Sequence, residues 1–328
     1  MRRLSLRRIM MLWAALALAW AVPGVSGGAE PEQIDRTVLE SPDPDLPAFD
    51  QEAVLTEQRA RVEPIRREVN VKAYAAESDH FLLIADLDVR VRGAILRWLE
   101  ELRSKTISHL RLPAGARLWD GKCVVVVFAR QESLVAYGKT FDNHDVGRSR
   151  GYFVLEARRS DEPRLVHIAT FQPVQGGNEA LREVLVHETT HAIIQLYRKS
   201  VKLPLWVHEG LAEYMTVAMD PNLQEAKQSR SYQRAAASPY VPLGDFWTRD
   251  FPASDLDGYS ISFSLIQCLL SIKPEGVMDF VVLMKAGMEP EQALGEAFQG
   301  LSYAELERRW KLFCLKTYLP KDVPGRTR

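Results

Sequence analysis

Residues 181–199 read LREVLVHETTHAIIQLYRK, a stretch that contains neither Gly nor Pro. The absence of both residues predicts one uninterrupted helix. Strand patterns are concentrated before this stretch and helical patterns after it. We therefore predict an α+β domain in which this helix lies between an N-terminal lobe with a mixed β-sheet, residues 50–177, and an all-helical C-terminal lobe, residues 178–328.

The N-terminal lobe is expected to have a central strand with the sequence KCVVVVF at residues 122–128. A nearly continuous β-branched run is typical of a strand buried on both faces. The segments GYFVLEA and LVHIATF, at 151–157 and 165–171, flank a charged turn and predict a hairpin or two neighbouring strands. Further strands are expected at 71–75 and 81–87, a helix at 89–108, and one or two surface helices at 49–68, where Pro64 interrupts the pattern.

Beyond residue 177 strand patterns fade and the chain is predicted to be helical. Apolar residues recur at helical spacing, and Pro residues stand near the starts of several segments. The predicted helices cover residues 179–199, 204–218, 259–272, 274–286, 290–298 and 303–318.

The first residues of the chain have the pattern of an export signal. Four arginines precede an uncharged apolar run at residues 9–22, and small, turn-forming residues follow it. This order is typical of a secretory signal peptide, which we place at residues 1–27. Residues 28–49 are rich in Pro and Asp and predict a flexible linker. We therefore expect an exported protein (periplasmic, secreted or at the cell surface), with a membrane tether only if the signal segment stays uncleaved.

The composition excludes one class of partner. The chain has 42 Lys and Arg against 43 Asp and Glu, a formal net charge of -1. This balance provides no positive field that would collect nucleic acid, so we expect no nucleic-acid partner. The three cysteines, Cys123, Cys268 and Cys314, lack the spacing of a thiolate metal site and are expected to be buried thiols; a disulfide between Cys268 and Cys314 is the alternative in an oxidising compartment.

His187, Glu188 and His191 form an HExxH pattern within the predicted helix. Residues four apart lie one turn above each other, so the two imidazoles can bind the same ion. Glu188 is rotated by about 100 degrees from His187. Its carboxylate is therefore expected beside the ion, where it can act as a base toward water, and the pattern predicts a Zn²⁺ site. No metal-binding spacing links the other, scattered histidines, which are His80, His109, His144 and His167.

A carboxylate on the next predicted helix can complete this site. Glu209 and Glu213 lie one turn apart in PLWVHEGLAEY. Catalytic zinc uses three protein ligands and leaves the fourth position to water. His208 is the alternative third ligand, but neighbouring helical residues point about 100 degrees apart. Only one of His208 and Glu209 can therefore face the ion.

HETTH followed by WVHEGLAEY resembles the signature of the gluzincin zinc metallopeptidases, which include thermolysin-like enzymes, zinc aminopeptidases and the peptidase MA-like domains of exported bacterial proteins. The resemblance covers about residues 181–270 and implies a zincin-like fold with Glu209 as third zinc ligand. It implies that Glu213 hydrogen-bonds a ligand histidine. GYSISFSLIQCLL is similar to the family's Y-x-x-S/G helix, which implies that Tyr259 stabilises the oxyanion. His208 stands where aminopeptidases usually carry Asn, and their G-x-M-E-N motif is absent, which argues against a typical aminopeptidase.

The resemblance implies hydrolysis of peptide bonds in a peptide or protein substrate, with Glu188 as general base. Two alternatives stay open: a catalytically inactive peptide-binding protein on a peptidase fold, and a zinc hydrolase of cell-wall crosslinks. The strand at 151–157 directly precedes the metal-binding helix and is expected to lie at the cleft rim, where it could pair with an extended peptide. On this hypothesis, replacing Tyr152 or Val154 changes KM.

Overall fold

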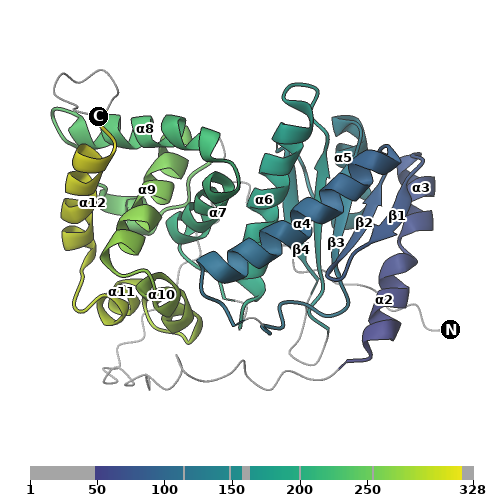
Figure 1. Ribbon diagram of the computed structural model, residues 1–328, viewed down its shortest axis with the longest axis horizontal. Coiled ribbons are helices and arrows are strands. Elements are labelled where there is room, and N and C mark those ends of the chain that lie inside the picture. The colour runs from purple at the N-terminus through teal and green to yellow at the C-terminus, as the bar shows by residue number, and fades with distance from the viewer. Residues whose placement is uncertain are drawn as a thin grey trace, which may run out of the picture.

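The computed structural model describes residues 49–319, apart from 114, 148, 157–162, 199–200 and 253–254. The predicted signal peptide and nearly all of the predicted linker lie outside the described residues. About 60% of the described residues are helical, and their strands form one small mixed sheet, which confirms the α+β class. The sheet with its helices lies on the right in Figure 1 and the C-terminal helices on the left. Within the described part, no helix has the length and hydropathy needed to cross a bilayer.

The sheet has its three parallel strands in the middle and an antiparallel strand at each edge. Its order is β1-β2-β3-β5-β4, with β2, β3 and β5 parallel. All six residues of the central strand are buried, which confirms the prediction from KCVVVVF. The last two strands pair antiparallel, as expected. The strands are β1 (Tyr74–Glu77), β2 (Phe81–Ala85), β3 (Cys123–Phe128), β4 (Gly151–Leu155) and β5 (Val166–Phe171).

Helices cover both faces of the sheet. Because successive strand residues point to opposite faces, Leu83 joins the core beneath α4 (Val89–His109) and α6 (Gly177–Leu196), whereas Leu82 joins the core beneath α3 (Val62–Val69) and α5 (Gln131–Tyr137). Figure 1 shows α4 crossing the front of the sheet, with α6 next to it.

The N-terminal helices differ from the prediction in where the chain breaks. The predicted interruption at Pro64 is wrong: the break lies at residues 60–61, between α2 (Gln51–Arg59) and α3. Pro64 is in the first turn of α3, where a backbone N–H has no partner within the helix, so its ring does not interrupt the hydrogen bonds.

The C-terminal lobe consists of helices packed around α7 and α9. Figure 1 shows α8 across the top of this group and α12 along its outer edge. The predicted helices are confirmed with small changes at their ends, but α5 and α8 were not predicted. The sequence of α8, QEAKQSRSYQRAA, buries only Ser231 and Ala235, so it has no apolar stripe to reveal it. The helices are α7 (Leu205–Met219), α8 (Gln224–Ala236), α9 (Leu256–Ile272), α10 (Gly276–Lys285), α11 (Pro290–Ala297) and α12 (Tyr303–Thr317).

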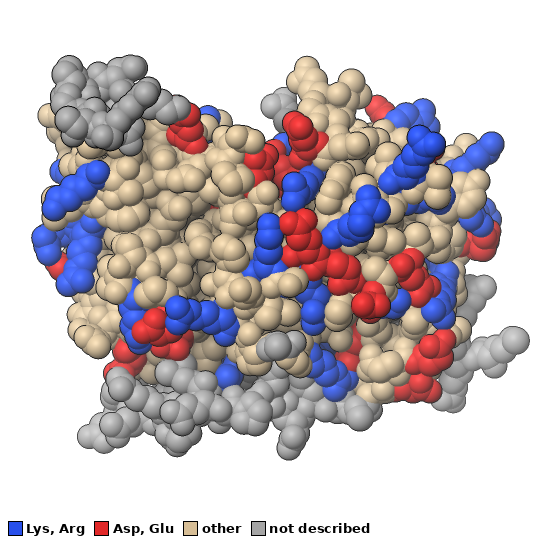
Figure 2. Space-filling view, in the orientation of Figure 1, with Lys and Arg blue, Asp and Glu red and all other residues tan. Residues whose placement is uncertain are grey.

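The three cysteines are buried free thiols, so the alternative of a disulfide between Cys268 and Cys314 is not realised. On the face shown in Figure 2, Lys and Arg lie beside Asp and Glu, and neither sign covers a large continuous area. On α4, for example, Glu101 pairs with both Lys105 and Arg182. This local pairing accompanies the near-zero net charge of the chain.

Helices α7 and α9 approach each other closely at Gly210. A Cβ atom there would lie 2.5 Å from the carbonyl oxygen of Ser262 and 2.7 Å from Cγ1 of Ile266. Non-bonded carbon atoms prefer separations of about 3.5–4 Å. The glycine after Glu209 therefore allows α9, which carries Tyr259, to pack directly against α7.

Replacing Gly210 with Ala should lower the free energy of unfolding by roughly 1–3 kcal/mol, the usual cost of overpacking, although Ala is the better helix former. The measurement is the midpoint of urea unfolding. Gly93→Ala on α4 is the matched control, because the nearest atom to its new Cβ is Arg97 Nη1 at 3.6 Å. We expect the control to unfold at the same or a higher urea concentration. Equal effects of the two substitutions would contradict this account of the α7–α9 contact.

Candidate metal site

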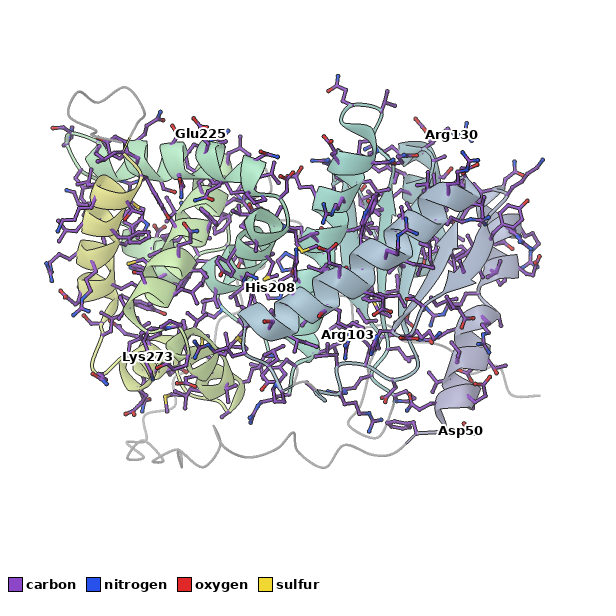
Figure 3. All side chains as sticks on the ribbon, in the orientation of Figure 1. Asp50, Arg103, Arg130, His208, Glu225 and Lys273 are labelled. Carbon is purple, nitrogen blue, oxygen red and sulfur yellow. The ribbon has the colours of Figure 1, made fainter. Side chains whose placement is uncertain are left out.

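The predicted metal ligands come together where α6 packs against α7. Helix α6 contacts β4 and β5 with one side and α7 with another. His187 and His191 lie one turn apart on α6, and Glu209 lies near the start of α7. His191 and Glu209 are buried and His187 is half-buried. The site is thus mostly enclosed by the two lobes, near the middle of the molecule, where Figure 3 labels His208.

Three potential ligand atoms form a small triangle. The Nε2 atoms of His187 and His191 are 3.0 Å apart. Oε2 of Glu209 lies 3.2 Å from the His187 Nε2 and 3.4 Å from the His191 Nε2. Ligands at about 2.0–2.1 Å from a tetrahedral zinc ion are separated by about 3.3 Å. The three side chains therefore have the spacing of three corners of a zinc tetrahedron.

The donor set also fits a metal chemically. Oε2 of Glu209 is buried, and its contacts with the two imidazole nitrogens lack the geometry of well-formed hydrogen bonds. A buried carboxylate oxygen without a partner is costly unless a cation satisfies it. Two imidazoles and one carboxylate suit zinc better than calcium or magnesium, which prefer oxygen ligands. Other first-row divalent metals accept the same donors, so the set is not specific to zinc.

Charges in the site favour cation binding. Burial lowers the pKa of His187, but the neighbouring carboxylates of Glu209 and Glu213 outweigh burial and raise it well above its usual value. Burial likewise opposes ionisation of Glu209, but His191 and His187 hold the pKa of this carboxyl below its usual range. The protein thus concentrates negative charge around the imidazoles, and a divalent cation that binds there would displace protons.

Glu213 lies behind His187, on the side away from the other ligands. Its Oε1 is 3.2 Å from Nδ1 of His187, and both of these groups are shielded from bulk water. A carboxylate at Nδ1 favours the tautomer with the proton on that nitrogen, which leaves Nε2 free to bind a metal. The structure therefore places Glu213 at the position that the resemblance implies.

Glu188 and Tyr259 flank the triangle. Glu188 is half-buried, and burial raises the pKa of its carboxyl, while His187 and His191 oppose this rise. Tyr259 is carried by α9, with its ring 6.2 Å from that of His187. Burial, with the charges of Glu209 and Glu188, raises the pKa of Tyr259. Its hydroxyl stays protonated at neutral pH and can donate a hydrogen bond.

His208 does not join the ligand triangle. Its ring stacks on that of His191, with centroids 4.2 Å apart and an interplanar angle of 12°. Burial lowers its pKa well below the usual value, and the neighbouring His191 lowers it further. The position of His208 is thus that of a neutral ring packed against a potential ligand, and Glu209 occupies the third corner.

Phe153 of β4 is a site residue that sequence analysis missed. Its ring lies 5.7 Å from His191 and 6.1 Å from His208. Tyr152 and Val154, which we expected to affect peptide binding, belong to the core on the opposite face of the sheet. Alternation along β4 turns Phe153 toward α6 and its neighbours away, so an effect of Tyr152 or Val154 on KM would have to act through the backbone of β4, and it stays a prediction. The alternation itself was the available signal.

No protein-family model matches this chain, and no curated protein shows a significant match to it.

A second buried polar cluster lies on the sheet face covered by α3 and α5. His167 of β5 is 2.9 Å from Asp142 through Nε2 and 2.7 Å from Glu156 through Nδ1. Arg61 donates two hydrogen bonds to Glu156, and Tyr152 donates one to Asp142. Both nitrogens of His167 are engaged by carboxylates, which leaves no lone pair for a metal or for proton abstraction. This cluster is a structural ion network.

This network should make folding stability depend on pH. Burial lowers the pKa of His167, but the charge and hydrogen bond of Asp142 and the hydrogen bond of Glu156 outweigh burial and raise it to about 9. The network's contribution to the free energy of unfolding is therefore complete below the pKa of about 6.5 that His167 has in the unfolded chain. It is lost as the pH rises through the folded-state pKa of about 9. The expected loss of unfolding free energy is on the order of 3 kcal/mol, measured by urea unfolding between about pH 6 and about pH 10.

His167→Gln should be less stable than the parent at about pH 6 and should lack this part of the pH dependence. His80→Gln is the control, because His80 is partly exposed in its pair with Glu100. The control should keep the alkaline loss of stability. The same pH profile in both variants would show that another group causes it.

Proposed function

We propose that this protein is a zinc-dependent metallopeptidase with a zincin-like fold, similar to the gluzincins. The observation that carries the proposal is the triangle of His187, His191 and Glu209, with edges of 3.0, 3.2 and 3.4 Å, placed next to the carboxylate of Glu188. Three protein ligands leave one position of a tetrahedral ion open, as catalytic zinc requires.

Each surrounding residue has a role that its position supports. Zinc, when bound, supplies positive charge that acidifies water and polarises a carbonyl group. Glu188 accepts a proton from the attacking water and passes it to the leaving amine, and its raised pKa suits a group that both takes and returns a proton. Tyr259 donates a hydrogen bond to the oxyanion that develops on the substrate. Glu213 keeps His187 in the tautomer that binds through Nε2.

The edge strand β4 is the proposed binding strand for an extended peptide. It is the outer strand of the sheet beside β5, and α6 packs against it. A peptide can extend the sheet through backbone hydrogen bonds at such an edge. Hydrogen exchange on the Glu188→Gln variant tests this: a bound peptide should protect amides of β4. Unchanged exchange in β4 at saturating peptide would refute the binding mode.

Metal analysis combined with a peptide-library digest tests the proposed function. The purified mature protein should carry close to one zinc per chain and cleave peptides, chelation should stop cleavage, and added zinc should restore it. Preparations of Glu209→Gln control for contaminating proteases. Bound zinc without cleavage of any peptide would instead support the peptide-binding alternative or a cell-wall crosslink as substrate.

We also propose that residues 1–27 direct export of the protein and that a peptide or protein outside the cytoplasm is its substrate. The support is the order of arginines, apolar run and small residues at the N-terminus. N-terminal sequencing of the protein from the extracytoplasmic fraction should begin near residue 28. Full-length protein in the cytoplasm would contradict this.

A further inference from the structure

Helix α8 contributes a lysine to the environment of the metal site. Oε1 of Glu213 faces Nδ1 of His187, and Oε2 of the same carboxylate accepts a hydrogen bond from Nζ of Lys227. The Glu213 and Lys227 side chains are only 10% and 15% exposed. A pair this well shielded is screened much less by water and salt than a surface ion pair.

The lysine restricts the carboxylate on which His187 depends. With one oxygen bonded to a single partner, a carboxylate can rotate about its terminal torsion, which has a broad energy minimum. With its second oxygen held by an ammonium group, Glu213 has both oxygens engaged, one by His187 and one by Lys227. Charge-assisted hydrogen bonds are about twice as strong as neutral ones, so this second bond orients the group firmly.

The position of Lys227 is set by the way α8 packs on α9. Ser231, one turn after Lys227, donates a hydrogen bond to the carbonyl oxygen of Ser260 over 2.8 Å. Ser260 directly follows Tyr259, so the same stretch of α9 supports α8 and presents the phenol. In Figure 1, α8 lies above α7 and α9, and Glu225 in Figure 3 marks its first turn. The helix that sequence analysis missed therefore delivers a side chain to the site.

We propose that Lys227 is a positioning residue of the metal site, which holds the Glu213 carboxylate in the orientation that directs Nε2 of His187 toward the ion. The inference rests on the proposed function, because it assumes that His187 binds a metal. Among the described residues, the ammonium group of Lys227 pairs with Glu213 and not with a residue of the ligand triangle. Its effect passes through Glu213, and this distinguishes it from a salt bridge that merely joins α7 to α8.

Zinc affinity, measured by competition with a chromophoric chelator on the full mature chain, tests the proposal without using activity. Lys227→Met should weaken zinc binding by about tenfold, which is the smaller end of the affinity losses seen when residues that orient a metal ligand are replaced. Lys227→Arg should recover most of this loss, because a guanidinium also donates to a carboxylate. Arg230→Met, which removes a cation from the same helix, is the matched control and should bind zinc like the parent.

A double-mutant cycle identifies the route of the effect. Glu213→Gln should weaken zinc binding, and adding Lys227→Met should cause no further loss, because the carboxylate on which Lys227 acts is already absent. Circular dichroism and metal-free unfolding curves verify that each variant is folded. If Lys227→Met does not fold, Lys227→Gln takes its place in the cycle.

Zinc affinity of Lys227→Met equal to that of the parent would overturn the proposal, and so would a full tenfold loss that persists in the Glu213→Gln background. Equal losses in Lys227→Met and Arg230→Met would also overturn it, since they would reflect helix charge alone. A parent protein that binds no zinc would instead refute the proposed function, so the two failures are distinguishable.

Discussion

Glu188→Gln should reduce kcat for peptide hydrolysis by roughly 10²–10⁴-fold, the usual contribution of a general base. The substitution keeps the size of the side chain but removes its ability to accept a proton. Zinc content should stay the same, because Glu188 lies outside the triangle of His187, His191 and Glu209. Steady-state kinetics and metal analysis on the same preparation measure both quantities.

The matched control is Glu183→Gln on the same helix. Glu183 has a side chain that is 35% exposed, pairs with Arg150 and is not one of the three potential ligands. This variant should keep both zinc and kcat. A Glu188→Gln enzyme with undiminished kcat would remove Glu188 from the mechanism, and one that loses zinc would show that Glu188 is a ligand instead.

Glu209→Gln should lower zinc affinity by more than about 100-fold. This exceeds the loss of about 10–100-fold that is typical when a residue hydrogen-bonded to a metal ligand is replaced. An amide oxygen lacks the negative charge that the buried carboxylate supplies between the two imidazoles. The loss can be measured as stability: zinc at 100 times its dissociation constant should raise the parent's unfolding free energy by about 2.7 kcal/mol. The same zinc concentration should leave Glu209→Gln nearly unchanged.

His208→Phe separates the two candidates for the third ligand. Phe keeps an aromatic ring against His191 but has no nitrogen with which to bind a metal. We expect this variant to retain zinc and its stabilising effect, in contrast to Glu209→Gln. Zinc retention by Glu209→Gln together with zinc loss by His208→Phe would reverse the assignment.

Sequence reasoning succeeded where local geometry decides the outcome. The central strand followed from KCVVVVF because a run of β-branched residues needs burial on both faces. It failed for α8, whose buried positions, Ser231 and Ala235, are too small to form an apolar pattern. Lys227 was missed with it. The strand β4 was predicted, but not which of its residues faces the site. That residue is Phe153, because the packing of other elements against the sheet decides which strand face lies toward the site.

The sequence alone determined the pairing of His187 with His191, and the rotation of Glu188 away from them, since helix geometry relates residues within one turn whatever surrounds them. The resemblance pointed to Glu209 as third ligand, but only the tertiary structure shows its oxygen beside both imidazoles, His208 stacked on His191, and how Tyr259 approaches. These positions depend on the distances between separate helices. Such distances follow from side-chain packing, as at Gly210, and no spacing along the chain specifies them.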